Sequence, residues 1–200
     1  MVSGTPLLTA RSLTLSRGGR ELFESLSFEV ASGQLVQIEG ANGAGKTSLL
    51  RILAGLSRYG YEGEVECVAP PLYLGHKSAV KSMLTPRENL SLHASGENFP
   101  EHDIEAALSR IGLYGYEDVP SHTLSAGQHR RVNLARLYLS SAALWLLDEP
   151  FTAIDRKGVA ELEELLVKHV TNGGAAVITS HQSLSVAYPV SLLNLRTGLN

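Results

Sequence analysis

A glycine-rich segment at residues 40–47 has the residue types needed to hold a polyphosphate. It reads Gly-Ala-Asn-Gly-Ala-Gly-Lys-Thr and matches the pattern G-x-x-x-x-G-K-[S/T] at every fixed position. Its glycines allow the backbone to turn so that successive N–H groups point at phosphate oxygens. We expect Lys46 to bridge the β and γ phosphates and the Thr47 hydroxyl to bind Mg²⁺. The alternative is a glycine-rich turn that holds no ligand.

Two adjacent carboxylates, Asp148 and Glu149, follow the apolar run 143–147. A buried strand rarely ends in two acids without a purpose, because an unpaired buried charge is costly. Asp148 is suited to Mg²⁺ coordination through water. Glu149 could accept a proton from the water that attacks a γ-phosphate, or orient that water. The alternative is a solvated acidic turn.

A second segment suited to phosphate lies at 124–128, Leu-Ser-Ala-Gly-Gln, just before an expected helix. It offers the Ser125 hydroxyl, the Gly127 backbone and a helix N-terminus. Three arginines follow on the helix, but solvated or structural charge explains them better than nucleic acid does. A net charge of -3 and a sequence pI near 6.2 also argue against a nucleic-acid partner.

The bulk composition indicates one domain. The chain has 200 residues, of which 44% are hydrophobic, enough for one good core. Its single cysteine, Cys67, cannot form an internal disulfide, so we expect a strand position and a reducing compartment. The longest strongly apolar stretch, 142–147, is far too short to cross a bilayer, so any link to a membrane must come through a partner.

The elements that must position these residues follow from hydrophobic periodicity. Alternation and caps predict strands at 7–15, 26–30, 34–39, 143–147, 175–179 and 192–195, and helices at 47–54, after Thr85-Pro86, at 104–111, 126–139 and 156–169. Strand and helix flank the glycine-rich segment, as phosphate binding requires. We predict an α/β fold with a parallel sheet, a β-rich beginning and an inserted helical subdomain at about 77–140.

Together these motifs resemble those of the ABC ATPase family, whose signature is usually Leu-Ser-Gly-Gly-Gln, so that Ala126 is a mild departure. The resemblance implies a P-loop NTPase core that hydrolyses ATP with Mg²⁺. It also implies two copies paired head to tail, with each nucleotide between the phosphate loop of one chain and Ser125 and Gly127 of the other. His181, after the strand 175–179, matches the switch histidine that touches the γ-phosphate. Asp155 matches a residue at the dimer seam, although it is equally suited to cap the next helix. The resemblance assigns to the nucleotide the continuous run Gly40, Ala41, Asn42, Gly43, Ala44, Gly45, Lys46, Thr47 and Ser48.

Two positions depart from the usual family pattern. His76 stands where most members have a glutamine, and its imidazole could still contact Mg²⁺ or a bound water. Arg17 stands where most members have an aromatic residue that stacks on adenine, and a guanidinium can stack on a base as well. Together with the sequences of residues 124–132 and 150–155, these two departures make the chain resemble the haem-exporter ATP-binding subunits of bacterial cytochrome c maturation.

That subgroup implies a peripheral protein on the cytoplasmic face of the bacterial inner membrane, bound to a membrane permease and acting on a haem chaperone only indirectly. The residues themselves do not specify what is transported. Alternatives are the ATPase subunit of another exporter, a soluble ABC-type ATPase of translation or DNA repair, and a nucleotide kinase. The kinase hypothesis leaves 124–128 and His181 unexplained.

Overall fold

The computed structural model describes residues 6–57, 59–93 and 99–195. The chain divides into two compact units. One comprises residues 1–76, 142–150 and 161–200, and the other comprises residues 77–141 and 151–160. Each unit has its own hydrophobic core and is described separately below.

An antiparallel sheet begins the first unit. It contains β1 (Pro6–Arg17), β2 (Arg20–Ala31) and β4 (Glu62–Cys67) in the order β2-β1-β4. Gly18 and Gly19, with φ of 59° and 74°, form the two-residue turn between β1 and β2, which requires positive φ at both positions. The strands expected at 7–15 and 26–30 are confirmed within longer strands, and Cys67 does lie in a strand, β4.

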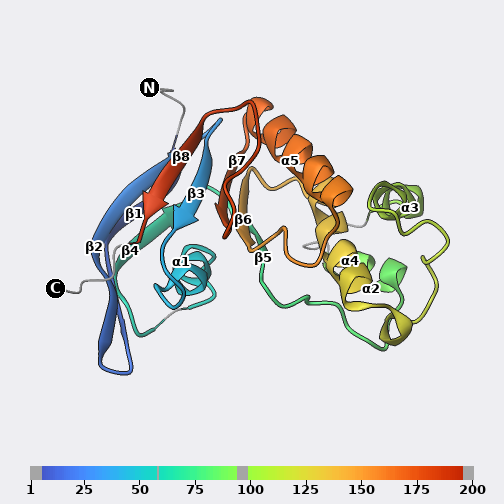
Figure 1. Cartoon of the computed structure of the whole chain (residues 1–200), viewed down its shortest axis with the longest axis horizontal. Helices are drawn as coiled ribbons and strands as arrows, with labels where there is room; N and C mark the ends of the chain where they lie inside the picture. The colour runs from blue at the N-terminus through green and yellow to red at the C-terminus, as the bar shows by residue number, and fades with distance from the viewer. Residues whose placement is uncertain (1–5, 58, 94–98, 196–200) are drawn as a thin grey trace. The chain divides into compact units, whose positions relative to one another are not determined.

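A five-stranded parallel sheet forms the centre of the same unit (Figure 1). Its strands are β3 (Leu35–Glu39), β5 (Leu72–Leu74), β6 (Leu144–Asp148), β7 (Ala175–Thr179) and β8 (Val190–Asn194), in the order β5-β6-β7-β3-β8. Every residue of β6 and β7 is buried, as expected for inner strands covered on both faces. The predicted parallel sheet is therefore confirmed.

One face of the parallel sheet packs against α1 (Lys46–Leu53) and the antiparallel sheet. Helix α1 follows β3 directly, so the glycine-rich segment is the connection between them (Figure 1). Gly55, just past the helix, has φ of 69° and ends it with a left-handed residue, as the sequence predicted. The shared core includes buried side chains from α1 and both sheets: Leu8, Leu13, Val30, Val36, Ile38, Leu49, Leu50, Ile52, Leu53, Leu144, Leu146 and Val177.

Helix α5 (Arg156–Thr171) buries Leu162, Leu166 and Val170, which recur at helical spacing. Its last turns also carry His169, whose ring stacks on Trp145 of β6 with the ring centroids 3.7 Å apart and the planes 5° apart. This contact fixes the C-terminal part of α5 against β6.

The second unit is helical. It contains α2 (Pro86–His93), α3 (Glu101–Arg110), a short 3₁₀ turn at Ser121–Thr123 and α4 (Ala126–Leu139), around a core that includes Leu90, Leu108 and Val132. The predicted capping box at the start of α2 is present, because Thr85 Oγ1 accepts the Glu88 N–H at 3.2 Å and Glu88 Oε2 accepts the Thr85 N–H at 2.8 Å. Residues 151–160 also belong to this unit, which the sequence did not indicate. Within the described ranges, no helix is long and apolar enough to cross a membrane.

Candidate functional site

The glycine-rich segment forms a loop that turns from the end of β3 into α1. Gly43 and Gly45 have φ of 79° and 96°, a region that strains other residues. Gly45 caps α1 and lies so close to β2 that an added Cβ would come within 3.2 to 3.3 Å of Leu22 and Phe23. The loop and the N-terminus of α1 thus share one concave turn, and backbone N–H groups at a helix N-terminus favour an anion.

The Lys46 ammonium group lies inside this loop. Its Nζ donates to the carbonyl oxygens of Gly40 at 2.7 Å and Ala41 at 3.2 Å. Only 9% of the residue is exposed. The charge is therefore held at the base of the loop by backbone dipoles, ready to meet an anion that enters the turn.

A hydroxyl and a carboxylate meet where α1 begins and β6 ends. Thr47 Oγ1 donates to Asp148 Oδ1 at 3.1 Å, and Thr179 Oγ1 donates to the same oxygen at 2.8 Å. Asp148 is 1% exposed and is held by two hydroxyl groups from different elements. Oxygen ligands of this kind are those Mg²⁺ prefers, and Mg²⁺ is commonly held by one or two protein oxygens together with substrate phosphates.

Glu149 adopts a strained backbone conformation directly after β6. Its φ is 50°, a left-handed value that costs a non-glycine residue roughly 1 to 2 kcal/mol. Its N–H donates to Thr179 Oγ1 at 2.9 Å, which holds the turn in place. The Glu149 side chain lies with Oε1 3.4 Å from His181 Nε2. The structure thus brings together an acid from the end of β6 and a histidine from the end of β7.

Lys46, Thr47, Glu149 and His181 line one open cavity of about 380 Å³. Seven consecutive loop residues, 42–48, form much of its wall, and Leu22, His76, Glu149 and His181 complete it. Ser48 and His76 therefore lie in the lining of the same cavity, and their contact with a nucleotide stays a prediction. Among the described residues no group of three or more His, Cys, Asp or Glu side chains could hold a metal ion unaided. A divalent cation at Thr47 and Asp148 would accordingly bring further oxygen ligands with it.

The sequence did not indicate two residues of this site. Leu22 forms a wall of the cavity, and Thr179 joins Asp148 to the backbone of Glu149. Leu22 belongs to a strand whose other residues show no motif. Thr179 is 0% exposed and ends an otherwise apolar strand, which is the one signal that could have singled it out.

The segment Ser125–Gln128 lies in the helical unit, at the start of α4. Ser125 caps the helix, because its Oγ accepts the Gln128 N–H at 3.2 Å while Gln128 Oε1 accepts the Ser125 N–H at 2.8 Å. Gly127 lies beside the 151–155 turn, where an added Cβ would be 3.2 Å from the Ala153 carbonyl oxygen. The absence of a side chain there allows the first turn of α4 and the 151–155 turn to approach each other.

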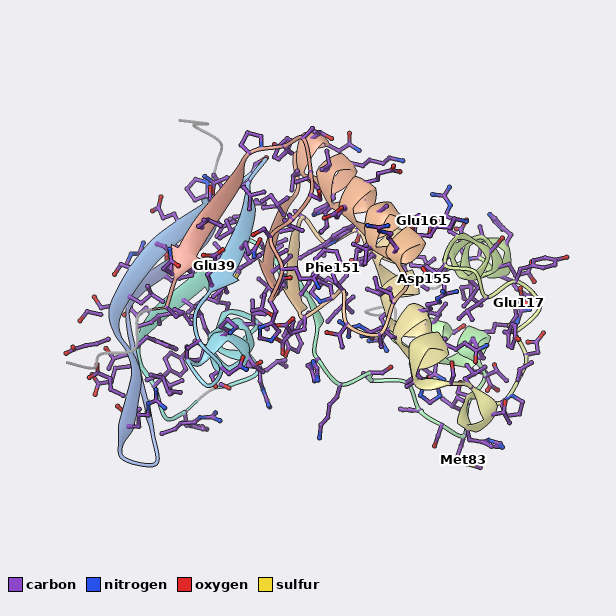
Figure 2. All side chains as sticks on the ribbon, in the orientation of Figure 1. Glu39, Met83, Glu117, Phe151, Asp155 and Glu161 are labelled. Carbon is purple, nitrogen blue, oxygen red and sulfur yellow. The ribbon has the colours of Figure 1, made fainter. Side chains whose placement is uncertain are left out.

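Asp155 lies at the N-terminal end of α5, as Figure 2 shows. Its Oδ1 accepts the Gly158 N–H at 2.8 Å, and its Oδ2 pairs with Arg131 of α4 at 2.7 Å. The Gly158 hydrogen bond, followed by the nearby Arg131 charge, holds the pKa of this carboxyl below its usual range. The helix-cap interpretation is therefore confirmed, and the carboxylate also ties α4, through Arg131, to the 151–155 turn within one unit.

Comparisons with known proteins match these features to one family. The family profile described as ABC transporter matches residues 23–152, more than half of the chain, including the phosphate loop, the segment 124–128 and both acids. The chain belongs to the ABC transporter family. It is 51% identical to a cytochrome c biogenesis ATP-binding export protein of Hahella chejuensis over 98% of both chains. It is 47% identical to the protein of that name from Shewanella oneidensis, over 98% of this chain and 96% of the relative.

Solved structures of ABC proteins share the fold. An ATP-binding subunit of an ABC transporter superposes with a TM-score of 0.83 at 22% identity, covering 96% of this chain and 87% of the other. An ABC transporter ATP-binding protein from Pyrococcus furiosus superposes with a TM-score of 0.79 at 24% identity, covering 94% and 96%. The predicted ABC-type α/β fold is confirmed.

The two departures from the ABC pattern have different structural outcomes. His76 lines the cavity together with Glu149 and His181. Arg17 is exposed at the end of β1, paired in register with Arg20 across the hairpin turn, and is not among the residues that line the cavity. Leu22, from the neighbouring strand β2, does line the cavity. Contact of Arg17 with adenine therefore stays a prediction.

Proposed function

We propose that the chain is the ATP-hydrolysing subunit of an ABC transporter complex that serves cytochrome c biogenesis. The observation that carries the proposal is the cavity in which the phosphate loop, His76, Glu149 and His181 meet. A polyphosphate on the loop would place its terminal phosphoryl group near the acid and the histidine. For water to attack this phosphoryl group, the protein needs only to position the reactants and to stabilise charge.

In this proposal each residue of the site has a role that follows from where it lies. The loop N–H groups and Lys46 bind the β and γ phosphates of ATP. Thr47 and Asp148 would hold Mg²⁺, which when bound neutralises charge on those phosphates. Glu149 accepts a proton from the attacking water. His181, 3.4 Å from Glu149, contacts the γ-phosphate and keeps that water in line.

Two copies of the chain are needed for efficient hydrolysis in this proposal. The segment 124–128 of one copy closes over the nucleotide held by residues 40–48 of the other, with Ser125 and Gly127 contributing a hydroxyl and a backbone N–H. Both groups lie at the N-terminus of α4, where an anion is favoured. The Arg131–Asp155 pair holds α4, which begins within this segment, against the 151–155 turn, so that both could face the partner.

The transport role rests on relatives. Those with 45 to 51% identity are named as cytochrome c biogenesis ATP-binding export proteins, and each match covers nearly the whole of both chains. We infer that this chain lies on the cytoplasmic face of the inner membrane, bound to a membrane permease, and that it powers haem handling on the far side without binding haem itself. The alternative that remains is the ATPase subunit of another exporter.

The deciding experiment tests the ATPase activity and the cytochrome c role separately. The chain is purified alone and with the permease encoded beside it, and Mg²⁺-dependent ATP hydrolysis is measured with and without the haem chaperone. Hydrolysis that requires the permease and responds to the chaperone supports the full proposal. Hydrolysis indifferent to the chaperone would retain the ATPase and remove the cytochrome c role, and absence of hydrolysis in every preparation would remove both.

A further inference from the structure

Gln37 is a buried amide in the middle of β3, an inner strand of the parallel sheet. The residue is 3% exposed, and its register neighbours are Ile178 on β7 and Leu192 on β8. Burying a polar side chain among apolar ones costs free energy unless the group is hydrogen-bonded. An apolar residue would fill this position at lower cost, so the amide needs an explanation that packing does not supply.

The amide is used to hold the segment that carries His181. Gln37 Nε2 donates to the carbonyl oxygen of Gln182 at 3.1 Å. The same carbonyl accepts the Ser180 hydroxyl at 2.8 Å, and Ser180 Oγ accepts the Gln182 N–H at 3.0 Å. Residues 180–182 therefore form a small closed turn, and His181 is its central residue.

The turn is anchored on both sides of His181. On the N-terminal side, Thr179 is bonded to Asp148 and to the backbone of Glu149. On the C-terminal side, the attachment to the sheet is the Gln37 hydrogen bond, which comes from a different strand. The His181 side chain is 61% exposed, so its surroundings constrain it weakly, and its direction depends on how firmly its backbone is held.

We propose that Gln37 is a positioning residue that orients His181 for the reaction. This inference rests on the proposed function, in which His181 contacts the γ-phosphate. Gln37 lies on the strand that runs straight into the phosphate loop, three residues before Gly40. One strand thus positions both the loop that holds the phosphates and the turn that carries His181. Gln37 itself is not among the residues lining the cavity.

A purely structural role makes a different prediction from a positioning role. If Gln37 only satisfies a buried group, its loss lowers stability and leaves turnover per folded molecule unchanged. If it positions His181, its loss lowers kcat, leaves ATP affinity in place, and has no effect once His181 is gone. Interaction through a shared group of this kind is what a double-mutant cycle measures.

The test uses Gln37→Met in the full chain, because methionine has a similar length and volume and no donor. ATP hydrolysis, ATP binding and thermal unfolding are measured in the wild type, Gln37→Met, His181→Ala and the double variant. We expect kcat to fall about 10-fold in Gln37→Met, within the range for a slightly misplaced group. ATP affinity should change by less than about twofold, and the double variant should match His181→Ala.

Two further variants keep the proposal open to refutation. Gln34→Met is the matched control, since the Gln34 side chain also bonds a backbone group but at the end of β2, where its Oε1 accepts the Ala31 N–H at 2.8 Å. It should keep wild-type kcat. Ser180→Ala removes the second bond to the Gln182 carbonyl without altering the packing of β3, and it should lower kcat in the same direction.

The outcomes separate this inference from the function on which it rests. Equal kcat in the wild type, Gln37→Met and Ser180→Ala would overturn the positioning role alone, as would a Gln37→Met effect that persists undiminished in the His181→Ala background. Wild-type turnover in His181→Ala would overturn the role of His181 and this inference together. A wild-type chain that binds no ATP would remove the proposed function itself.

Discussion

The Thr179 hydroxyl joins the two acidic residues of the site, donating to Asp148 Oδ1 at 2.8 Å and accepting the Glu149 N–H at 2.9 Å. It therefore fixes a carboxylate suited to Mg²⁺ and the strained backbone of the proposed general base at once. Because β6 and β7 are neighbours in the sheet, with Asp148 opposite Thr179, this bridge forms across one strand pair.

Replacing Thr179 by valine tests this bridge. Valine has nearly the same shape and no hydroxyl, so the sheet should keep its packing while Asp148 and Glu149 lose a shared partner. We expect turnover to fall on the order of 10- to 100-fold, as for misplaced catalytic groups. ATP hydrolysis and thermal unfolding of Thr179→Val are compared with Thr179→Ser, which keeps the hydroxyl and should retain most activity. Equal loss in both variants would mean that the methyl group matters and the bridge does not.

Glu149→Gln should separate binding from hydrolysis. Glutamine has the same shape but cannot accept a proton, and loss of a general base typically costs 10²- to 10⁴-fold in rate. We expect ATP to bind normally and turnover to fall about 100-fold or more. Because ATP then persists at the interface, ATP should also shift the variant to a dimer in sedimentation experiments. Normal turnover would refute the role of Glu149.

Lys46→Ala should abolish nucleotide binding. The ammonium group at the base of the loop meets the phosphates in the ground state and the transition state alike, so its loss affects affinity directly. The lysine also bonds the carbonyls of Gly40 and Ala41, so the loop geometry must be checked by thermal unfolding. Titration with a fluorescent ATP analogue measures the affinity. An affinity equal to that of the wild type would mean that residues 40–47 have another role.

The sequence was most informative about features that depend only on residues close together in the chain. Residues 40–47 follow a spacing that few other structures require, and β7 and α4 were predicted at their observed bounds, 175–179 and 126–139, from an apolar run and helical periodicity. The acids 148–149 were recognisable because charge follows a buried strand. In each case neighbouring residues in the chain carry enough information to define the element.

Features that depend on which strands are neighbours could not be predicted in the same way. Gln37 and Thr179 are buried polar residues in mostly apolar strands, and their partners come from neighbouring parts of the sheet: Asp148 ends β6, and Gln182 lies just after β7. Arg17 lies beside the hairpin turn and outside the cavity lining, and its contact with adenine stays a prediction. Membership of residues 151–160 in the helical unit likewise depends on contacts such as Arg131 with Asp155, distant in sequence.

Stability should depend on pH through His169, which lies against Trp145 and bonds the Ala143 carbonyl through Nε2 at 3.1 Å. Burial lowers the pKa of His169 below its usual value, and hydrogen bonds to the carbonyls of Ala143 and Ala175 oppose this only in part. Gly174 leaves the room for the ring, since a Cβ there would collide with it. The folded chain thus holds this imidazole in its neutral form to a lower pH than the unfolded chain does.

The sign follows from proton binding. In the unfolded chain the imidazole takes up a proton near pH 6.5, whereas the folded chain takes it up only at lower pH. The unfolded state therefore binds more protons in this window, and the free energy of unfolding decreases as pH falls through about 6.5. Urea unfolding of the wild type and of His169→Gln at pH 7.5 and pH 5.5 measures this. The values at pH 7.5 give the packing cost of the substitution, and a smaller decrease between the two pH values is expected in the variant. An identical decrease in both proteins would show that other groups set the pH dependence and that His169 is only a packing residue.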